Sequence, residues 1–253
     1  MAVNQRVGPV VDHLAFAAII LGLFYLAHFA VPATIPTPGD IVGAFQEQLA
    51  NGAIVEATTK ALYAIAVGYA ISVAIGISVG IAMGVNWHSE QLLEPYVNAL
   101  YVVPVTALVP AFIIWFGTGF QIRVFVIVLF ATFPILINTF EGVKSVPPGL
   151  VEATRSFGAG SVYVIRNVVI PHEIPYITAG LRLGIGRAVK ALVITELIVS
   201  VSGFGRIISR WSAANALEGV FSVVFVLMAL GVLSTWLVAL IERRIVHWDV
   251  GEN

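Results

Sequence analysis

Long apolar runs separated by short polar stretches dominate this chain of 253 residues. The first run, 14–31, is just long enough to cross the hydrocarbon core of a bilayer. Hydrophobic residues make up 59% of the chain and charged residues only 11%, whereas charged residues alone reach about a quarter of a soluble globular domain. The chain is therefore expected to be an integral membrane protein.

The apolar runs predict an all-α polytopic membrane protein with six transmembrane helices in a single domain, 1–253. Six spans place both termini on one side of the membrane, and that side also holds the long loop 141–175. It carries more Lys and Arg than the other side, which predicts cytoplasmic termini. The expected spans are 14–31, 61–85, 94–116, 122–140, 176–199 and 219–241. The basic residues are Arg6, Lys144, Arg155, Arg166, Arg182, Arg243 and Arg244 on this side, against Lys60, Arg123, Arg206 and Arg210.

Several function classes have no support in the sequence. A net charge of −1 gives no general attraction to nucleic acid. The absence of cysteine removes thiolate chemistry and Cys-type metal sites, and the five histidines form no metal-binding pair. No phosphate-binding Gly-x-x-x-x-Gly-Lys-Ser/Thr motif occurs, and no hydrolase motif is present. The chain is therefore not expected to be an enzyme, to hydrolyse ATP or to bind nucleic acid.

The second expected span carries a small residue at every fourth position between Ala64 and Gly84. Such a stripe lets another helix approach closely, because helices in lipid associate through van der Waals packing. Before this span, apolar residues recur at helical spacing over 41–51, which predicts a short helix at the membrane surface with Asp40 as its N-cap.

Prolines and polar residues interrupt the third and fourth spans. Pro104 and Pro110 each remove a backbone hydrogen bond from the third span, and Asn138 lies near the end of the fourth. Carbonyl groups freed in this way must face protein or a wet cavity. A kinked packing helix and the wall of a translocation pathway, including Thr106, both fit this pattern.

The fifth span is unusual because it contains Arg187, Lys190 and Glu196. Ionisable groups at membrane depth face a protein interior or a water-filled cavity. Two interpretations remain open for the basic residues. They contact an anionic substrate, or they form structural ion pairs with Glu196 or with a neighbouring helix.

The loop 141–175 is the longest interruption between apolar runs. The sequence Pro-Pro-Gly at 147–149 cannot continue the preceding helix. A short helix is expected to begin near Leu150 and to end at Gly158 in a left-handed conformation.

A second helix in this loop is expected to begin near Ser161. Pro171 and Pro175 are expected to stop or turn it before the fifth span.

The loop carries a motif with long and specific spacing. Glu152, Ala153 and Thr154 are followed by Gly158 and, after nine further residues, by 168–171. This resembles the cytoplasmic EAA loop of ATP-binding cassette (ABC) importer permeases, which reads Glu-Ala-Ala, three residues, Gly, nine residues, Ile-x-Leu-Pro. The spacing is kept, while Thr replaces the second Ala, Val the first Ile, and Ile the Leu. A plain surface helix between two spans is the alternative that the loop alone leaves open.

Nearly the whole chain is similar to the nitrate/sulfonate/taurine-type branch of these permeases. The further matching stretches are 35–38, 103–117, 133–139, 180–198 and 242–248. The resemblance implies a type I ABC importer permease fold in a bacterial cytoplasmic membrane. It also implies a homodimer of this chain, two cytoplasmic ABC ATPase subunits and an extracytoplasmic substrate-binding protein. ATP and Mg²⁺ belong to the ATPase partner, and no cofactor is expected in this chain.

The resemblance assigns two groups of residues. Those expected to couple to the ATPase are Pro148, Gly149, Leu150, Glu152, Ala153, Thr154, Arg155 and Gly158. Those expected along the pathway of a small anionic solute (nitrate, sulfonate, taurine, bicarbonate or aromatic acid) are Pro104, Thr106, Pro110, Asn138, Arg187, Lys190 and Glu196. A stand-alone secondary carrier or channel is the alternative function. It would also contain intramembrane charges and broken helices, but it leaves the loop unexplained.

Overall fold

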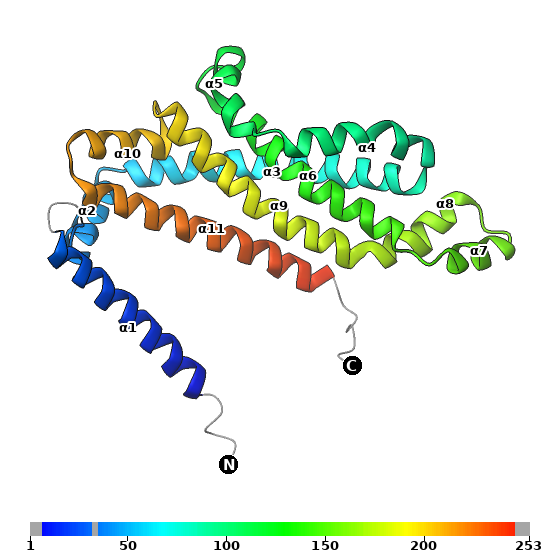
Figure 1. Cartoon of the computed structure of the whole chain (residues 1–253), viewed down its shortest axis with the longest axis horizontal. Helices are drawn as coiled ribbons and strands as arrows, with labels where there is room; N and C mark the ends of the chain where they lie inside the picture. The colour runs from blue at the N-terminus through cyan, green and yellow to red at the C-terminus, as the bar shows by residue number, and fades with distance from the viewer. Residues whose placement is uncertain (1–6, 32–34, 246–253) are drawn as a thin grey trace.

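The computed structural model describes residues 7–31 and 35–245 and, within them, contains helices and no strand. Helix α1 (Val7–Ala30) diverges from an elongated bundle that the other helices form (Figure 1). Arg6 and Trp248 lie outside the described residues. The other elements are α2 (Pro38–Ala50), α3 (Ala53–Val85), α4 (Trp87–Val102), α5 (Val105–Phe116), α6 (Phe120–Lys144), α7 (Pro148–Ser156), α8 (Ser161–Val164), a π-helical segment (Ile165–Val169), α9 (Ile170–Val199), α10 (Gly203–Ala213) and α11 (Leu217–Ile245).

Helices α3, α6 and α9 form the centre of the bundle, and small residues bring their backbones together. A Cβ atom added to Gly76 of α3 would lie 2.8 Å from the Cβ of Ile135 on α6. One added to Gly184 of α9 would lie 2.8 Å from Cγ1 of the same isoleucine. Ile135 is therefore held between glycines of two neighbouring helices. The predicted stripe of small residues is confirmed as a packing face.

The third expected span is two helices rather than one kinked helix. Helices α4 and α5 meet at 95° across Val103 and Pro104. Val103 is extended (φ −60°, ψ 129°), as the residue before a proline favours. Pro110 lies inside α5 without ending it. Helix α4 begins at Trp87, before the expected start of the third span at 94, and Asn86 caps it by accepting a hydrogen bond from the backbone N–H of His88 at 3.0 Å.

Three described helices, α3, α6 and α11, are long and apolar enough to cross a membrane. The number rises to five if each of two bent pairs counts as one span. The first pair is α4 with α5, and the second is the continuous helix 161–199 with α10, which bends by 50°. The six spans and their orientation remain predictions.

Helix α2 confirms the short helix expected after the first span, but its cap differs. Thr37 is the N-cap, and its hydroxyl accepts a hydrogen bond from the backbone N–H of Asp40 at 3.2 Å. The Asp40 carboxylate accepts the N–H of Thr37 in return at 3.0 Å. The expected cap, Asp40, is therefore the third helical residue of a capping box.

The expected stop at Pro171 and Pro175 is wrong. The chain stays helical from Ser161 through the π-helical segment 165–169 into α9. Pro171 falls in the first turn of α9 and Pro175 lies inside it, so both interrupt the backbone hydrogen bonds of a continuous helix. The wider π turn takes up the irregularity that the prolines impose.

Candidate coupling loop and membrane pathway

Helix α7 projects at one end of the bundle, beyond α6 and α9 (Figure 1). It begins at Pro148 and ends at Ser156, and Gly158 follows in the left-handed region with φ +86°. Both ends confirm the expected short helix, since a proline suits the first turn and a glycine the position after the end.

A small apolar cluster fixes the base of α7. The side chains of Val143 and Val146, at and just after the end of α6, pack with Val164 of α8 and Val169 of the π-helical segment. Val151 of α7 packs against this cluster. The helix is thereby held on a stiff Pro-Pro turn at one end and on the continuous helix 161–199 at the other.

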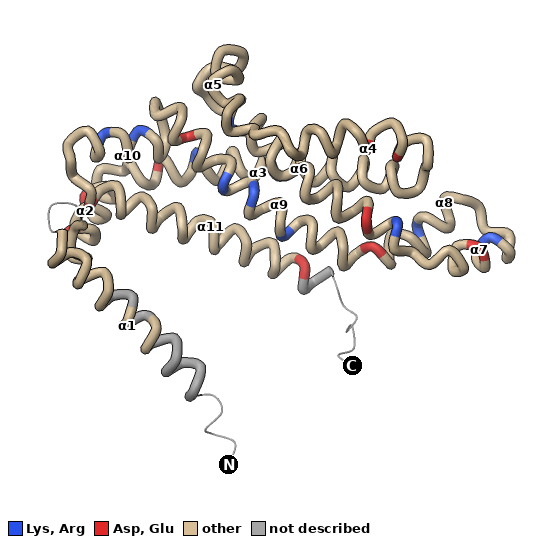
Figure 2. Tube along the Cα trace, viewed as in Figure 1, with Lys and Arg blue, Asp and Glu red and all other residues tan. Residues whose placement is uncertain are grey.

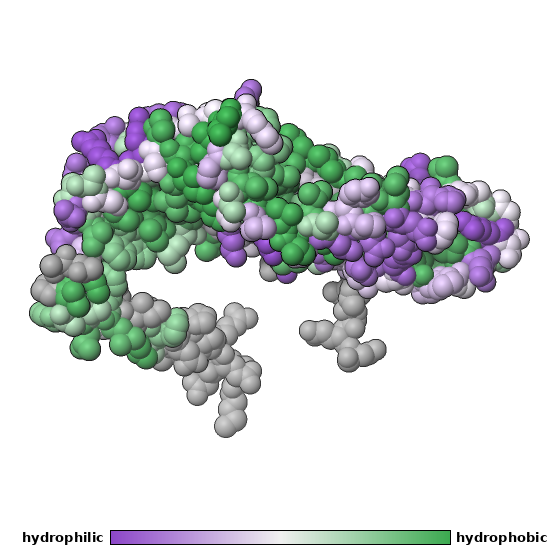
Figure 3. All heavy atoms as spheres, turned by 45° about the horizontal axis from the view of Figure 1, so that its top comes forward, coloured by the Kyte–Doolittle hydropathy of each residue, from purple (hydrophilic) through white to green (hydrophobic). Residues whose placement is uncertain are grey.

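The outer surface of α7 combines charged and apolar side chains. Phe157 is 92% exposed and Leu150 47% exposed. Glu152, Ala153 and Arg155 are also exposed. Figure 3 shows hydrophilic residues interspersed with hydrophobic ones at this end of the molecule. A surface that exposes aromatic and aliphatic side chains together with charged ones is typical of a docking site.

The predicted pathway residues separate into distinct places. Pro104 and Thr106, at the α4–α5 break, line a hollow of about 160 Å³ together with Arg187 of α9. Lys190, one turn further along α9, lines a different, mostly apolar hollow between α9 and α11. The structure therefore brings together three of the predicted residues and leaves Lys190 apart from them.

Asn138 and Pro110 lie elsewhere. The Asn138 side-chain amide donates to the carbonyl oxygen of Pro134 in its own helix at 2.7 Å. Its Cβ faces Gly180 of α9, where an added Cβ would lie 3.0 Å away. Pro110 is exposed on α5. Neither residue lines the hollow at the α4–α5 break.

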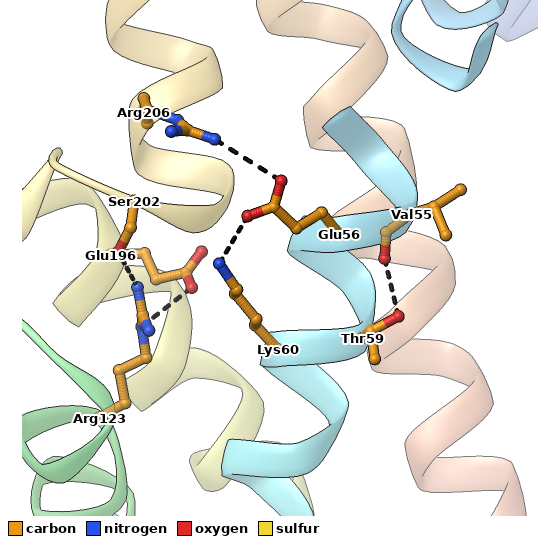
Figure 4. A network of polar contacts seen from close by, with 8 residues as sticks. All are labelled: Val55, Glu56, Thr59, Lys60, Arg123, Glu196, Ser202 and Arg206. Atoms are coloured by element: carbon orange, nitrogen blue, oxygen red, sulfur yellow. Dashed lines mark hydrogen bonds and ion pairs between the residues drawn. The ribbon is translucent and has the colours of Figure 1, made fainter. Parts of the chain in front are cut away.

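Glu196 lies in the protein interior and is only 1% exposed. Its Oε1 lies 3.1 Å from Nε of Arg123 on α6, and its Oε2 accepts the backbone N–H of Phe204 at 2.8 Å. Arg123 also donates to the hydroxyl of Ser202 (Figure 4). The sequence left open whether Glu196 forms an ion pair with Arg187 or Lys190. Glu196 pairs with Arg123 instead. This buried carboxylate joins three helices of one chain rather than facing a pathway.

Sequence reasoning missed this arrangement, although a signal was present. Gly203 and Gly205 come seven and nine residues after Glu196, and both leave room for it. A Cβ at Gly203 would lie 2.3 Å from Glu196 Oε1, and one at Gly205 1.8 Å from its backbone oxygen. A Glu followed by a Gly-x-Gly turn at this spacing thus indicates a carboxylate that caps the next helix.

Charged residues gather towards both ends of the bundle and along α9 (Figure 2). Around α10, Glu56 contacts Lys60 at 2.5 Å and Arg206 at 3.9 Å (Figure 4). At the α7 end, Lys144 of α6 contacts Glu90 of α4 at 2.6 Å. Lys60, Arg123 and Arg206 therefore lie at one end of the bundle and Lys144 at the other.

Residues 72–247 match the family described as binding-protein-dependent transport system inner membrane components. The chain belongs to this family of permeases. This permease is 33% identical over 219 residues to the aliphatic sulfonates transport permease protein SsuC of Bacillus subtilis (strain 168), which covers 86% of this chain and 79% of the relative. It is 35% identical over 220 residues to SsuC of Escherichia coli (strain K12), covering 85% and 82%.

A third relative and a solved structure extend the comparison. The riboflavin transport system permease protein RibX of Chloroflexus aurantiacus is 35% identical over 222 residues, covering 85% of this chain and 80% of the relative. The permease fold matches a chain of the methionine ABC transporter MetNI in inward-facing conformations with a TM-score of 0.59. That match covers 79% of this chain and 97% of the other at 19% identity. The expected importer permease fold and transport role are therefore confirmed.

Proposed function

We propose that two copies of this permease form the translocation pathway of an importer driven by two separate ABC ATPase subunits. Helix α7 docks on the ATPase, and an extracytoplasmic binding protein delivers the solute. ATP and Mg²⁺ are bound by the ATPase alone, and both permease termini lie in the cytoplasm. ATP-driven closure of the ATPases draws the two α7 helices together and opens the pathway outward. Hydrolysis then returns it to the cytoplasmic side.

The exposed surface of α7 carries this proposal. A nine-residue helix is too short to be stable alone, yet its base is fixed and its outer face presents Leu150 and Phe157 to solvent. The Pro-Pro turn and the packed base restrict its motion relative to α6 and α9. A partner that moves α7 therefore moves the two central helices with it.

The solute class follows from the hollow at the α4–α5 break. Among the described residues, Arg187 is the one basic residue that lines this hollow, beside Thr106 and aromatic side chains. A guanidinium group binds carboxylate and sulfonate groups through paired hydrogen bonds. Together with the aliphatic sulfonates named for two relatives, this supports a small organic anion as the solute.

Substitution of Ala153 tests the docking of α7. Ala153 is exposed and contributes little to the fold, so Ala153→Glu is expected to insert and purify normally. It is expected to lose co-purification with the ATPase. Ser161→Glu, which changes an exposed residue just outside α7, is the control. Normal transport by Ala153→Glu would contradict the proposal.

A stand-alone carrier is the second candidate, because a broken helix and intramembrane charges also occur in carriers. It would require neither the exposed face of α7 nor an ATPase. Solute flux down a gradient in liposomes that contain this chain alone would favour the carrier.

A further inference from the structure

A polar hollow of about 520 Å³ lies between α2, the start of α3 and α10, at the end of the bundle opposite α7 (Figure 1). Six of its lining residues are polar or aromatic: Glu47, Gln48, Asn51, Arg206, Arg210 and Trp211. Figure 3 shows hydrophilic residues over this end of the molecule. The hollow is separate from the one at the α4–α5 break, and neither α7 nor Arg187 contributes to it.

The walls of this hollow are fixed where three helices meet at Gly219 of α11. A Cβ on Gly219 would lie 1.9 Å from Cδ2 of Trp211, so the indole ring lies directly against the backbone. From the other side, Nε2 of Gln48 donates to the carbonyl oxygen of Gly219 at 3.3 Å and to Ser222 Oγ at 2.9 Å. The hollow is therefore part of the packed structure.

The helix that carries the two arginines is held just as firmly at its first turn. The backbone N–H of Phe204 donates to the buried carboxylate of Glu196 at 2.8 Å. Gly203 and Gly205 lie so close to Glu196 that no Cβ fits at either position. These contacts fix the backbone from which the arginine side chains of α10 extend.

Positive charge in the hollow is only partly neutralised. Arg206 and Arg210 are one helical turn apart and share a face of α10. Arg206 reaches Glu56 at 3.9 Å, but that carboxylate already contacts Lys60 at 2.5 Å. Within 7–31 and 35–245, Arg210 forms no ion pair.

The α2 wall supplies groups of the opposite kind. Glu47 forms no ion pair among the described residues. Gln48 is 1% exposed, and its Oε1 has no hydrogen-bond partner. That oxygen is itself buried, so the group of this wall within reach of a ligand is the exposed carboxylate of Glu47.

We propose that this hollow binds a small organic anion. Its carboxylate, sulfonate or phosphate group lies between Arg206 and Arg210, and its apolar part lies against Trp211. Glu47 favours a ligand whose other end is cationic or donates hydrogen bonds. The anionic group belongs either to a free solute or to a lipid phosphate. Binding does not depend on the proposed import function. The proposed topology puts α7 on the cytoplasmic side, and only on that basis does this hollow, at the opposite end, lie on the outer face.

Calorimetric titration of ethanesulfonate into the full-length chain, in micelles of an uncharged detergent without phospholipid, ATPase or ATP, tests this proposal. Saturable binding is expected. Arg210→Gln is expected to weaken it at least about tenfold, because a hydrogen bond to a charged group is lost, and Arg206→Gln is a second, independent variant. Lys190→Gln removes a positive charge of α9 that lines a different hollow, and it is expected to change affinity at most about twofold.

Nanodiscs of phosphatidylglycerol distinguish the two sources of the anion. A lipid ligand is expected to weaken ethanesulfonate binding and to remain attached in native mass spectrometry. It should be retained by the original chain and by Lys190→Gln, and lost from Arg206→Gln and Arg210→Gln. Equal binding by all variants overturns the proposal, as does the absence of both saturable ethanesulfonate binding and retained lipid.

Discussion

Arg123 and Glu196, 73 positions apart in the sequence, form an ion pair with 3.1 Å between Nε and Oε1. Their side chains are only 6% and 1% exposed. The same carboxylate accepts the first backbone N–H groups of α10, so one buried charge pair connects α6, α9 and α10. Removing one partner leaves the other charge buried and unpaired.

Glu196→Ala is therefore expected to lower the free energy of unfolding by about 3–5 kcal/mol. Replacing both charges, in Arg123→Met with Glu196→Met, is expected to recover most of this loss but to remain about 1 kcal/mol below the original protein, because the α10 cap is still missing. Thermal unfolding of the purified variants in detergent measures both effects.

The control for this pair is Glu242→Ala, because Glu242 contacts a half-exposed arginine, Arg182, at 2.6 Å. An exposed pair contributes at most about 1 kcal/mol. A similar loss of stability in both single variants would show that burial of the Arg123–Glu196 pair is not what matters.

Gly76→Ala tests the close approach of α3 and α6. The added Cβ would lie 2.8 Å from Cβ of Ile135 and 3.1 Å from the backbone oxygen of Thr132. The helices must move apart, at an expected cost of about 1–3 kcal/mol. Gly186→Ala on α9 is the matched control, since nothing lies within 4 Å of its Cβ position. It is expected to be neutral or to stabilise the helix by up to about 1 kcal/mol.

Glu173 predicts a pH dependence of stability. This residue lies in the predicted cytoplasmic loop and is fully buried, and neither carboxylate oxygen has a hydrogen-bond partner among the described residues. Burial disfavours the charged form and raises the pKa of Glu173 from 4.5 to about 7. Between these values the folded chain retains a proton that the unfolded chain releases. Stability therefore falls as the pH rises from about 4.5 to about 7.

Glu173→Gln keeps the size of the side chain and removes the titration. The variant is expected to unfold at a higher temperature than the original protein at about pH 8, where the gain has an upper bound of about 3 kcal/mol. At about pH 5 the two should converge. Glu141→Gln, which changes an exposed carboxylate of α6, is the control and should leave the dependence of stability on pH unaltered. If Glu173→Gln shows the same dependence as the original protein, Glu173 is not its source.

Arg187 and Lys190 line different hollows, so substituting each in turn tests which hollow belongs to the pathway. Because Arg187 lines the hollow at the α4–α5 break and Lys190 does not, Arg187→Gln is expected to reduce uptake of an anionic solute at least about tenfold, as expected for a lost charged hydrogen bond. Lys190→Gln is expected to remain near the original rate. Uptake by vesicles with a saturated binding protein measures both, and the reverse order of effects would place the pathway between α9 and α11.

Local signals in the sequence predicted much of the architecture. Small residues at every fourth position predicted the packing face of α3, and Pro-Pro-Gly with Gly158 predicted both ends of α7. These features depend on neighbours in the sequence and on backbone geometry, which the residue types express directly.

Relationships across the bundle could not be predicted in the same way. Pro104 permits either a kink or a break. The angle of 95° between α4 and α5 is set by how both helices pack. The partner of Glu196 lies on another helix, so no local pattern identifies Arg123. Pro171 and Pro175 were expected to end a helix, but the π-helical segment and the contact with α6 keep it continuous.

The most direct measurement is the ATPase activity of this permease co-purified in lipid with its ATPase subunit, with and without its binding protein. The expected result is activity that requires both subunits, rises with the solute-loaded binding protein, and is absent from preparations of Ala153→Glu, because this variant no longer retains the ATPase. A chain that purifies alone, binds no ATPase, and moves solute down a gradient in liposomes would contradict the importer function.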